Sequence, residues 1–278
     1  MAMRADLIYD VGSNNGDDAA YYLFRGFKVL AIEANPLLAA RLEQRFARQV
    51  ADGRLSILAV TVAEREGILP FWVNEQNDKF SSFNRELACR NGTQCHEIQV
   101  PARPFSEIVA EFGVPYYLKI DIEGSDALCI NCLDRTDLPR YISSEVSKSD
   151  DVLTRLFKVG YRRFKLINQG TYTESTPVFD REIAVRALRK ACVKLPPLGY
   201  VIRCLPSALK PRKHYFDDFA QSFEYRFPEG SSGPFGEETY GPWYTLDTAL
   251  RRLSDIRQAF LRAGPSAPDC WYDVHATY

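Results

Sequence analysis

The chain has 278 residues, of which 46% are hydrophobic and 26% are charged, and its formal net charge is -1 at pH 7. This composition is typical of a globular protein with one sizeable α/β core and an addition, and the balanced charge gives no indication of a nucleic-acid partner. No apolar stretch is long enough to span a bilayer, and no secretory signal pattern precedes the first predicted strand. We therefore expect a cytoplasmic protein without a membrane span.

Strands and helices alternate through residues 1–167, which is the pattern of a mostly parallel sheet. The spacing of apolar residues and turn signals predicts, in chain order, strand 7–10, helix 17–24, strand 27–32, helix 36–52, strand 54–62, strand 68–73, helix 106–112, strand 116–122, helix 125–133, strand 141–146, helix 151–158 and strand 161–167. These elements make six β/α units of one sheet.

The pattern changes after residue 168. Residues 168–244 are rich in Pro, Gly, aromatic residues and basic clusters, with one predicted helix at 181–192, and we interpret them as an insertion. Within it, the Gly/Pro/aromatic loop from Ser231 to Trp243 has the composition of a lid that closes over a polar substrate. An amphipathic helix from residue 245 and a last strand at 271–277 then complete the core.

The turn after the first predicted strand predicts a nucleoside ligand. Gly12 and Gly16 would let the backbone approach a ligand closely, and Glu33 ends the next strand about 20 residues later, where doubly wound folds place a carboxylate on ribose hydroxyls. A dinucleotide fingerprint needs a further glycine where Asn14 stands. The pattern Asp10-x-Gly12-x-x-x-Gly16 is instead similar to the first motif of class I S-adenosylmethionine-dependent methyltransferases. A tight turn without a ligand is the structural alternative.

A second motif runs from Leu118 to Asp126. Its charged residues Lys119, Asp121 and Glu123 alternate with apolar ones, so a strand would direct them to one face. Three such charges make sense at the carboxyl end of a strand, where open α/β sheets bind ligands. The Lys-Ile-Asp-x-Glu-Gly sequence, together with the first motif, Glu33 and Ser81-Ser82, resembles the FkbM-type methyltransferases over about half of the chain.

The resemblance implies a Rossmann-like class I methyltransferase sheet, mostly parallel with an antiparallel last strand, and S-adenosyl-L-methionine as cofactor. It also implies methyl transfer to an oxygen of a sugar, glycoconjugate or other small metabolite. Three parts are then expected: a cofactor-binding core at 1–167, an insertion or substrate-binding lid at 168–244, and the helix and strand at 245–278 that complete the core. The residues expected to surround the cofactor are Asp10, Gly12, Ser13, Asn14, Asn15, Gly16, Glu33, Ala34, Val62 and Asp121.

Several side chains compete for the catalytic role. Asp121 is the first candidate for general base or substrate anchor, and Glu123 and Glu145 are alternatives at neighbouring strand ends. Lys119 is either catalytic or the counter-ion that keeps Asp121 ionised. His275 alternates with Asp273 on the last strand and could be a base oriented by it, although a polar surface strand explains the pattern equally well.

Other functions remain open at this point. Asp121, Glu123 and Glu145 could together hold a divalent cation, which is not the favoured interpretation. A nicotinamide-dependent oxidoreductase on a similar sheet and a non-catalytic nucleoside-binding module are the alternatives from other functional classes. The seven cysteines indicate a reduced interior rather than a disulfide framework, and Cys89, Cys95 and His96 offer too few ligands for a metal site.

Overall fold

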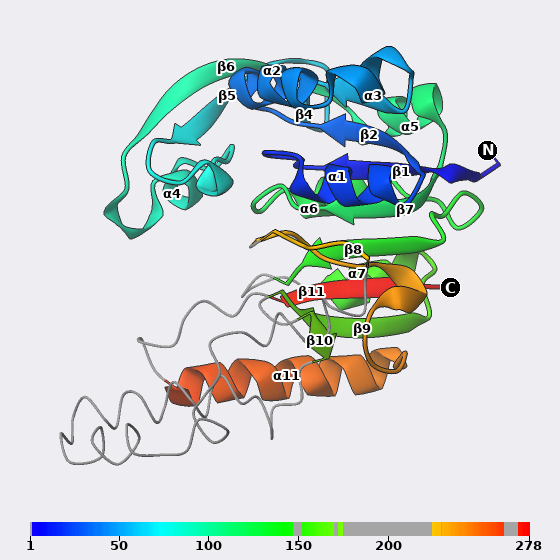
Figure 1. Cartoon of the computed structure of the whole chain (residues 1–278). Helices are drawn as coiled ribbons and strands as arrows, with labels where there is room; N and C mark the ends of the chain where they lie inside the picture. Colours follow the sequence, from blue (N-terminus) through cyan, green and yellow to red (C-terminus); the bar gives the residue numbers. More distant parts are fainter. Residues whose placement is uncertain (1, 147–151, 170–171, 175–223, 229, 264–271) are drawn as a thin grey trace, which may run out of the picture.

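The structure is a computed structural model that describes residues 2–146, 152–169, 172–174, 224–228, 230–263 and 272–278, with the backbone alone for 259–263. Its main sheet has the strand order β10-β9-β11-β8-β7-β1-β2-β3 (Figure 1). The strands are β1 (Arg4–Val11), β2 (Lys28–Ile32), β3 (Leu55–Leu58), β7 (Pro115–Ile120), β8 (Tyr141–Glu145), β9 (Arg163–Asn168), β10 (Thr173–Glu174) and β11 (Tyr272–Thr277). β11 runs antiparallel between β8 and β9. The expected mostly parallel sheet with an antiparallel last strand is confirmed.

Helices cover both faces of this sheet, because alternate residues of each strand are apolar on opposite sides. Leu118 and Ile120 of β7 belong to one buried cluster, which includes side chains of α5 (Phe105–Phe112), α6 (Asp126–Asn131), α7 (Val152–Val159) and α11 (Leu246–Ala263). Tyr117 of β7 belongs to the other, with α1 (Asp17–Phe24) and α2 (Pro36–Arg45). Figure 1 shows α1 in front of the sheet. The sheet is therefore buried on both faces.

The bounds of α1 agree with the sequence prediction, but the next helix is shorter than expected. α2 starts where Asn35 accepts a hydrogen bond from the Leu37 N–H at 3.0 Å, with Pro36 in the first turn. It ends at Arg45, because Phe46 with a φ of -114° interrupts the helix, and α3 (Ala47–Ala51) follows. The predicted single helix at 36–52 is therefore two helices, and Val50 is exposed rather than packed on the common face.

The predicted strand 54–62 is also two elements. The chain leaves the main sheet after β3, and β4 (Thr61–Val62) pairs with β6 (Cys95–Arg103) in a second sheet of order β4-β6-β5. β5 (Gly67–Asn74) is the extra strand expected at 68–73, whereas β6 was not predicted. Between them lie η1 (Asp78–Phe80), α4 (Arg85–Ala88) and η2 (Arg90–Gly92). Figure 1 shows this β5–β6 excursion beyond the ends of β1 and β2.

The expectation of reduced cysteines is wrong for one pair. Cys89 follows α4, Cys95 begins β6, and the two form a disulfide. The intervening chain turns back through Asn91 and Gly92, whose φ values of 61° and 76° allow the reversal that brings the two cysteines together. Cys129 and Cys132 are free, and Cys129 is buried as a small hydrophobe.

Two further sequence predictions concern the region 168–244 and the absence of a membrane span. The predicted helix at 181–192, and with it most of the 168–244 insertion, lies outside the described residues, so the three-part division of the chain stays a prediction. The described helices include none that is long and apolar enough to cross a bilayer.

Candidate active site

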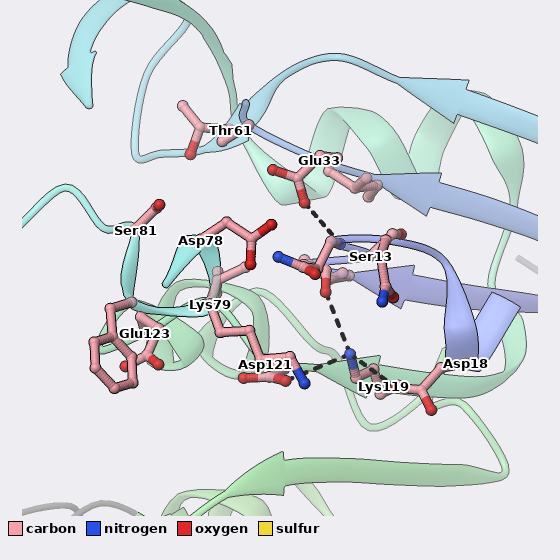
Figure 2. Close-up of a pocket in the computed structure, with 18 of the residues that line it drawn as sticks. Ser13, Asp18, Glu33, Thr61, Asp78, Lys79, Ser81, Lys119, Asp121 and Glu123 are labelled. Carbon is pink, nitrogen blue, oxygen red and sulfur yellow. Dashed lines mark hydrogen bonds and ion pairs between the residues drawn. The ribbon is translucent and has the colours of Figure 1, made fainter. Parts of the chain in front are cut away.

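A cavity of about 370 Å³ opens at the carboxyl ends of β1, β2 and β7, the edge where open α/β sheets bind ligands. One side of it is formed by the glycine turn after β1 and by the ends of β2 and β4. The other is formed by η1, by the turn after β7 and by residues 230–231. Figure 2 shows Glu33 and Thr61 on one side of this space, with Asp121, Lys119 and Asp18 opposite them.

The glycine turn packs directly against the end of β7. Gly12 has a φ of +83°, and a Cβ atom at this position would lie 1.9 Å from the carbonyl oxygen of Asp121. Ser13 donates its hydroxyl to the Asp10 carbonyl at 2.7 Å, which holds the turn on its own strand. Only a glycine therefore allows the turn and the Asp121 segment to approach this closely.

Glu33 follows β2 and faces the glycine turn. Its carboxylate accepts hydrogen bonds from the backbone N–H groups of Asn14 and Asn35, both at 2.8 Å. Burial raises the pKa of Glu33 to about 7, although these two hydrogen bonds act in the opposite direction. Each carboxylate oxygen has a further lone pair, so the group can also accept hydroxyl donors from a ligand in the cavity.

Lys119 is the centre of a buried charge network at the end of β7. Its Nζ lies 3.2 Å from an Asp10 oxygen, 3.3 Å from Asp18 and 3.5 Å from Asp121. Burial alone would lower the pKa of this lysine, but the three carboxylates raise it well above its usual value. Lys119 therefore stays charged and connects the first strand, α1 and the Asp121 turn, and its role as counter-ion or catalytic group stays a prediction.

Asp121 and Glu123 lie in the turn after β7 rather than on the strand itself. β7 ends at Ile120, and Glu123 has a φ of 35°, so the expected strand alternation does not extend to it. Both side chains nevertheless line the same cavity as Lys119. The Glu123 carboxylate receives two hydrogen bonds from Arg90, each at 2.8 Å, and its backbone carbonyl accepts the Ser82 hydroxyl at 2.9 Å.

Glu145 ends β8 and completes this wall of the cavity. Burial raises the pKa of Glu145 to about 8, and the nearby charges of Asp121 and Glu123 contribute in the same direction. Its carboxylate makes no hydrogen bond or ion pair within the described part of the chain. A carboxyl group with a pKa in this range is suited to take up a proton near neutral pH.

The loop around Ser231 covers part of the cavity. The backbone N–H of Ser232 donates to Asp18 at 2.7 Å, and Lys79 of η1 donates to the Gly230 carbonyl at 3.2 Å. Tyr172 donates its hydroxyl to the Ser231 carbonyl at 3.0 Å. Both α1 and the β5–β6 excursion therefore hold this loop in place.

Most residues predicted for the cofactor are brought together here. Those that line the cavity are Gly12, Ser13, Asn14, Asn15, Glu33, Ala34, Val62 and Asp121. Asp10 and Gly16 lie directly behind them: Asp10 pairs with Lys119, and Gly16 is the N-cap of α1. Their roles stay predictions, but their common location agrees with the motif.

His275 lies elsewhere. It is buried in β11 opposite Ser143, does not line the cavity, and neither ring nitrogen has a hydrogen-bond partner among the described residues. Burial and the charge of Lys165 lower the pKa of His275 to about 3, so the ring is neutral at physiological pH. The described residues contain no group of three or more His, Cys, Asp or Glu side chains placed to hold a metal ion.

Part of the site could not be found from motifs. Asp18 lies next to the glycine turn, but its link to Lys119 and Ser232 depends on tertiary packing. The β5–β6 excursion contributes further cavity residues that the sequence analysis missed, which are Phe71, Asp78, Lys79, Phe80, Phe83 and Arg90. The only local signal in that segment was Ser81-Ser82.

The mostly parallel sheet with β11 antiparallel between β8 and β9, the glycine turn and the acidic residue after β2 are the features expected of a class I methyltransferase. The sequence profile described as the methyltransferase FkbM domain matches residues 10–163, and the chain belongs to this family. Its cofactor is S-adenosylmethionine, as expected. Family membership replaces the nicotinamide-dependent alternative. The residues fit the cofactor, because Gly12 lets the turn pack against the Asp121 segment at the wall of the cavity and Glu33 offers a buried carboxylate there.

Comparisons with individual proteins reach only distant similarities. No curated protein matches the sequence. Among solved structures, a precorrin-6y C5,15-methyltransferase from Geobacter metallireducens GS-15 gives a TM-score of 0.34 and 11% identity over 63% of this chain and 74% of that chain. A phosphoethanolamine N-methyltransferase 2 from Haemonchus contortus, solved with S-adenosyl-L-methionine, gives 0.34 and 10% over 100% of this chain and 49% of that chain. The chain thus spans about half the length of the second protein.

Proposed function

We propose that this methyltransferase acts on a hydroxyl group of a small molecule, such as a sugar or another metabolite. The observation that carries the proposal is the location of Glu145, a carboxylate without a partner among the described residues, in the same cavity as the glycine turn and Glu33. An alcohol must lose its proton when it is methylated, so a nearby proton acceptor suits this class of acceptor.

The cofactor side of the site comprises the glycine turn, Glu33 and the ends of β2 and β4. Glu33 would accept the ribose hydroxyls, and the turn from Gly12 to Gly16 would surround the methionine portion. Ala34 and Val62, which line the same wall, would contact the adenosine. Bound there, the cofactor supplies an activated methyl group on a sulfonium centre. Asp10 and Lys119 position the turn through their buried ion pair at 3.2 Å.

The acceptor side comprises Asp121, Glu123 and Glu145. Asp121 would accept a hydrogen bond from the acceptor and orient it, and Arg90 fixes Glu123 beside it. Glu145 would take up the hydroxyl proton as the acceptor oxygen takes the methyl group, and the carbon–sulfur bond of the sulfonium would break to leave a neutral thioether. The chief contribution of the site is to hold the oxygen in line at near-attack distance.

The division of roles is testable with Glu33→Ala and Glu145→Gln. We expect Glu33→Ala to weaken cofactor binding about tenfold or more, because two hydroxyl contacts are lost. Glu145→Gln should bind the cofactor normally but lose turnover by about 100-fold. Calorimetric titration of the cofactor and a methyl-transfer assay separate the two effects.

The pH dependence provides a second readout. Turnover of the wild-type enzyme should rise with pH through about 8 and level off above it, because Glu145 must be ionised to accept the proton. This rise should be absent from the residual activity of Glu145→Gln. Equal losses of cofactor affinity in both variants, or an unchanged pH profile in Glu145→Gln, would contradict the assignment.

A further inference from the structure

The cations on the acceptor side of the cavity are already engaged by the protein. The Arg90 guanidinium binds both oxygens of Glu123 and lies over the Phe80 ring, 3.8 Å from its centroid. Lys79 is exposed and donates to the Gly230 carbonyl. A phosphate or carboxylate on the acceptor would have to displace Arg90 from a bidentate pair, which is among the stronger interactions that a guanidinium makes.

The carboxylates in this region exceed the available positive charge. Among the described residues, Lys119 is the one cation that pairs with Asp10, Asp18 and Asp121, so this group retains a net negative charge. Glu145 has no counter-ion in the described part of the chain; its pKa of about 8 keeps it largely protonated in the free enzyme, and a cation bound beside it would favour its ionised form. The sulfonium of the cofactor contributes one positive charge, while the ammonium and carboxylate of its methionine portion offset each other. Negative potential therefore remains on the acceptor side after the cofactor binds.

A second buried carboxyl group lies beside Glu145 on the neighbouring strand. Asp273 of β11 is directly opposite Glu145 in the antiparallel register with β8, is only 6% exposed, and has no hydrogen bond or ion pair to any described residue. Burial raises the pKa of Asp273 well above its usual value, and the charges of Asp121 and Glu145 contribute to this shift. Asp273 therefore interacts electrostatically with Asp121 and Glu145. A positive charge near Glu145 would reduce the repulsion among these carboxylates.

The apolar wall of the same space also suits a cation. Phe71 and Phe83 line the same cavity as the carboxylates and pack edge to face with ring centroids 5.3 Å apart. Aromatic faces attract cations through their quadrupole, and such faces beside carboxylates recognise ammonium groups. The aromatic rings and the excess of carboxylates are independent features, and both favour a positively charged ligand.

We propose that the acceptor carries a protonated amino group in addition to the hydroxyl that is methylated, and that the carboxylates around Asp121 and Glu145 select for it. The inference rests on the proposed hydroxyl methylation at this site. The ammonium would lie beside Asp121, with the Phe71 and Phe83 rings forming the apolar part of its environment. Acceptors that carry a phosphate or carboxylate in place of the ammonium would be excluded by repulsion.

The experiment uses S-adenosylmethionine with a radiolabelled methyl group and a small-molecule extract. The extract is separated at pH 7 into cation-exchanging, neutral and anion-exchanging fractions, and each is incubated with the full-length enzyme. We expect labelled product from the cation-exchanging fraction, with the methyl group on oxygen when the product is fragmented by mass spectrometry. Label confined to the neutral or anionic fractions would overturn the inference. Absence of label from every fraction would overturn the proposed function and with it this inference.

The position of the methyl group separates the two proposals. A cationic product methylated on nitrogen would refute hydroxyl methylation but retain the preference for a cation. For the product identified, Asp121→Asn should raise the acceptor KM about tenfold and leave cofactor affinity within about twofold. Asp52→Asn, which removes an equal charge at a remote surface site paired with Arg54, is the matched control and should leave the acceptor KM unchanged. Equal acceptor KM values in both variants would contradict the role of Asp121.

Discussion

Gly12 is the residue at which backbone conformation and ligand binding are most closely connected. Its φ of +83° disfavours any side chain, and a Cβ would collide with the Asp121 carbonyl at 1.9 Å. This close contact brings the glycine turn, on the cofactor side of the cavity, against Asp121 on the acceptor side. A substitution here must therefore displace one of the two segments.

We expect Gly12→Ala to abolish measurable cofactor binding and to lower the free energy of unfolding by about 2 kcal/mol or more, through strain and collision together. Gly26→Ala is a matched control, because Gly26 has a similar φ of +86° but a Cβ there would meet nothing within 4 Å. The control should cost only about 1 kcal/mol and leave cofactor binding intact. Calorimetric titration and urea unfolding measure the two quantities, and the same binding loss in both variants would show that strain alone is responsible.

At the scale of elements, the loop around Ser231 is held by contacts that α1 and η1 provide. Asp18 is central, because one of its oxygens pairs with Lys119 at 3.3 Å and the other accepts the Ser232 N–H at 2.7 Å. The loop that covers the cavity is thereby connected to the buried lysine behind the cofactor turn. The position of the loop therefore depends on α1.

Asp18→Ala should release the loop. We expect the Ser232 amide to exchange with solvent about tenfold faster or more, because a charge-assisted hydrogen bond is lost. Asp18→Asn keeps an acceptor oxygen and should retain most of the protection, and Asp17→Ala removes a neighbouring carboxylate that pairs with Arg45 instead. Hydrogen exchange measured on a peptide spanning residues 230–238 distinguishes these cases. Unchanged exchange in Asp18→Ala would show that the other loop contacts suffice.

The sequence predicted elements whose signals are local and missed those that depend on pairing partners. α1 was predicted at its observed bounds because the glycine turn and apolar spacing define it. β6 was missed, since its residues are largely polar or exposed and Pro101 interrupts a strand pattern. The split between β3 and β4 arises because Thr61 pairs with Ala102 of that missed strand.

In the candidate site, too, some residues could be placed from the sequence and others could not. The cofactor wall follows from residues at the ends of consecutive parallel strands, which topology brings together, so Glu33 and Asp121 could be placed from spacing. Arg90 could not, because its pairing with Glu123 requires the β5–β6 excursion to fold back over the end of β7. The sequence of the β5–β6 excursion predicts a strand, but it does not indicate that this segment will line the cavity.

At the scale of the whole molecule, the buried carboxyl groups predict how stability depends on pH. Burial raises the pKa of Glu33 to about 7 and that of Glu145 to about 8, whereas both would ionise near 4.5 in the unfolded chain. Between these values the folded state binds more protons than the unfolded state, so stability falls as pH rises from about 4.5 to 8. His275, with its pKa lowered to about 3 by burial, acts in the opposite direction only below about pH 6.5.

The free enzyme should therefore be more stable at pH 6.5 than at pH 8.5, where the two carboxyl groups are forced to ionise while buried. The urea midpoint at each pH measures this difference. Glu145→Gln should reduce it, because a neutral amide removes one of the two titrations, whereas Glu43→Gln on the exposed face of α2 should not. A midpoint that rises with pH, or that responds equally to both substitutions, would show that Glu145 does not hold its proton in the folded protein. The same ionisation prepares Glu145 for catalysis, so the proposed base and the loss of stability have one physical cause.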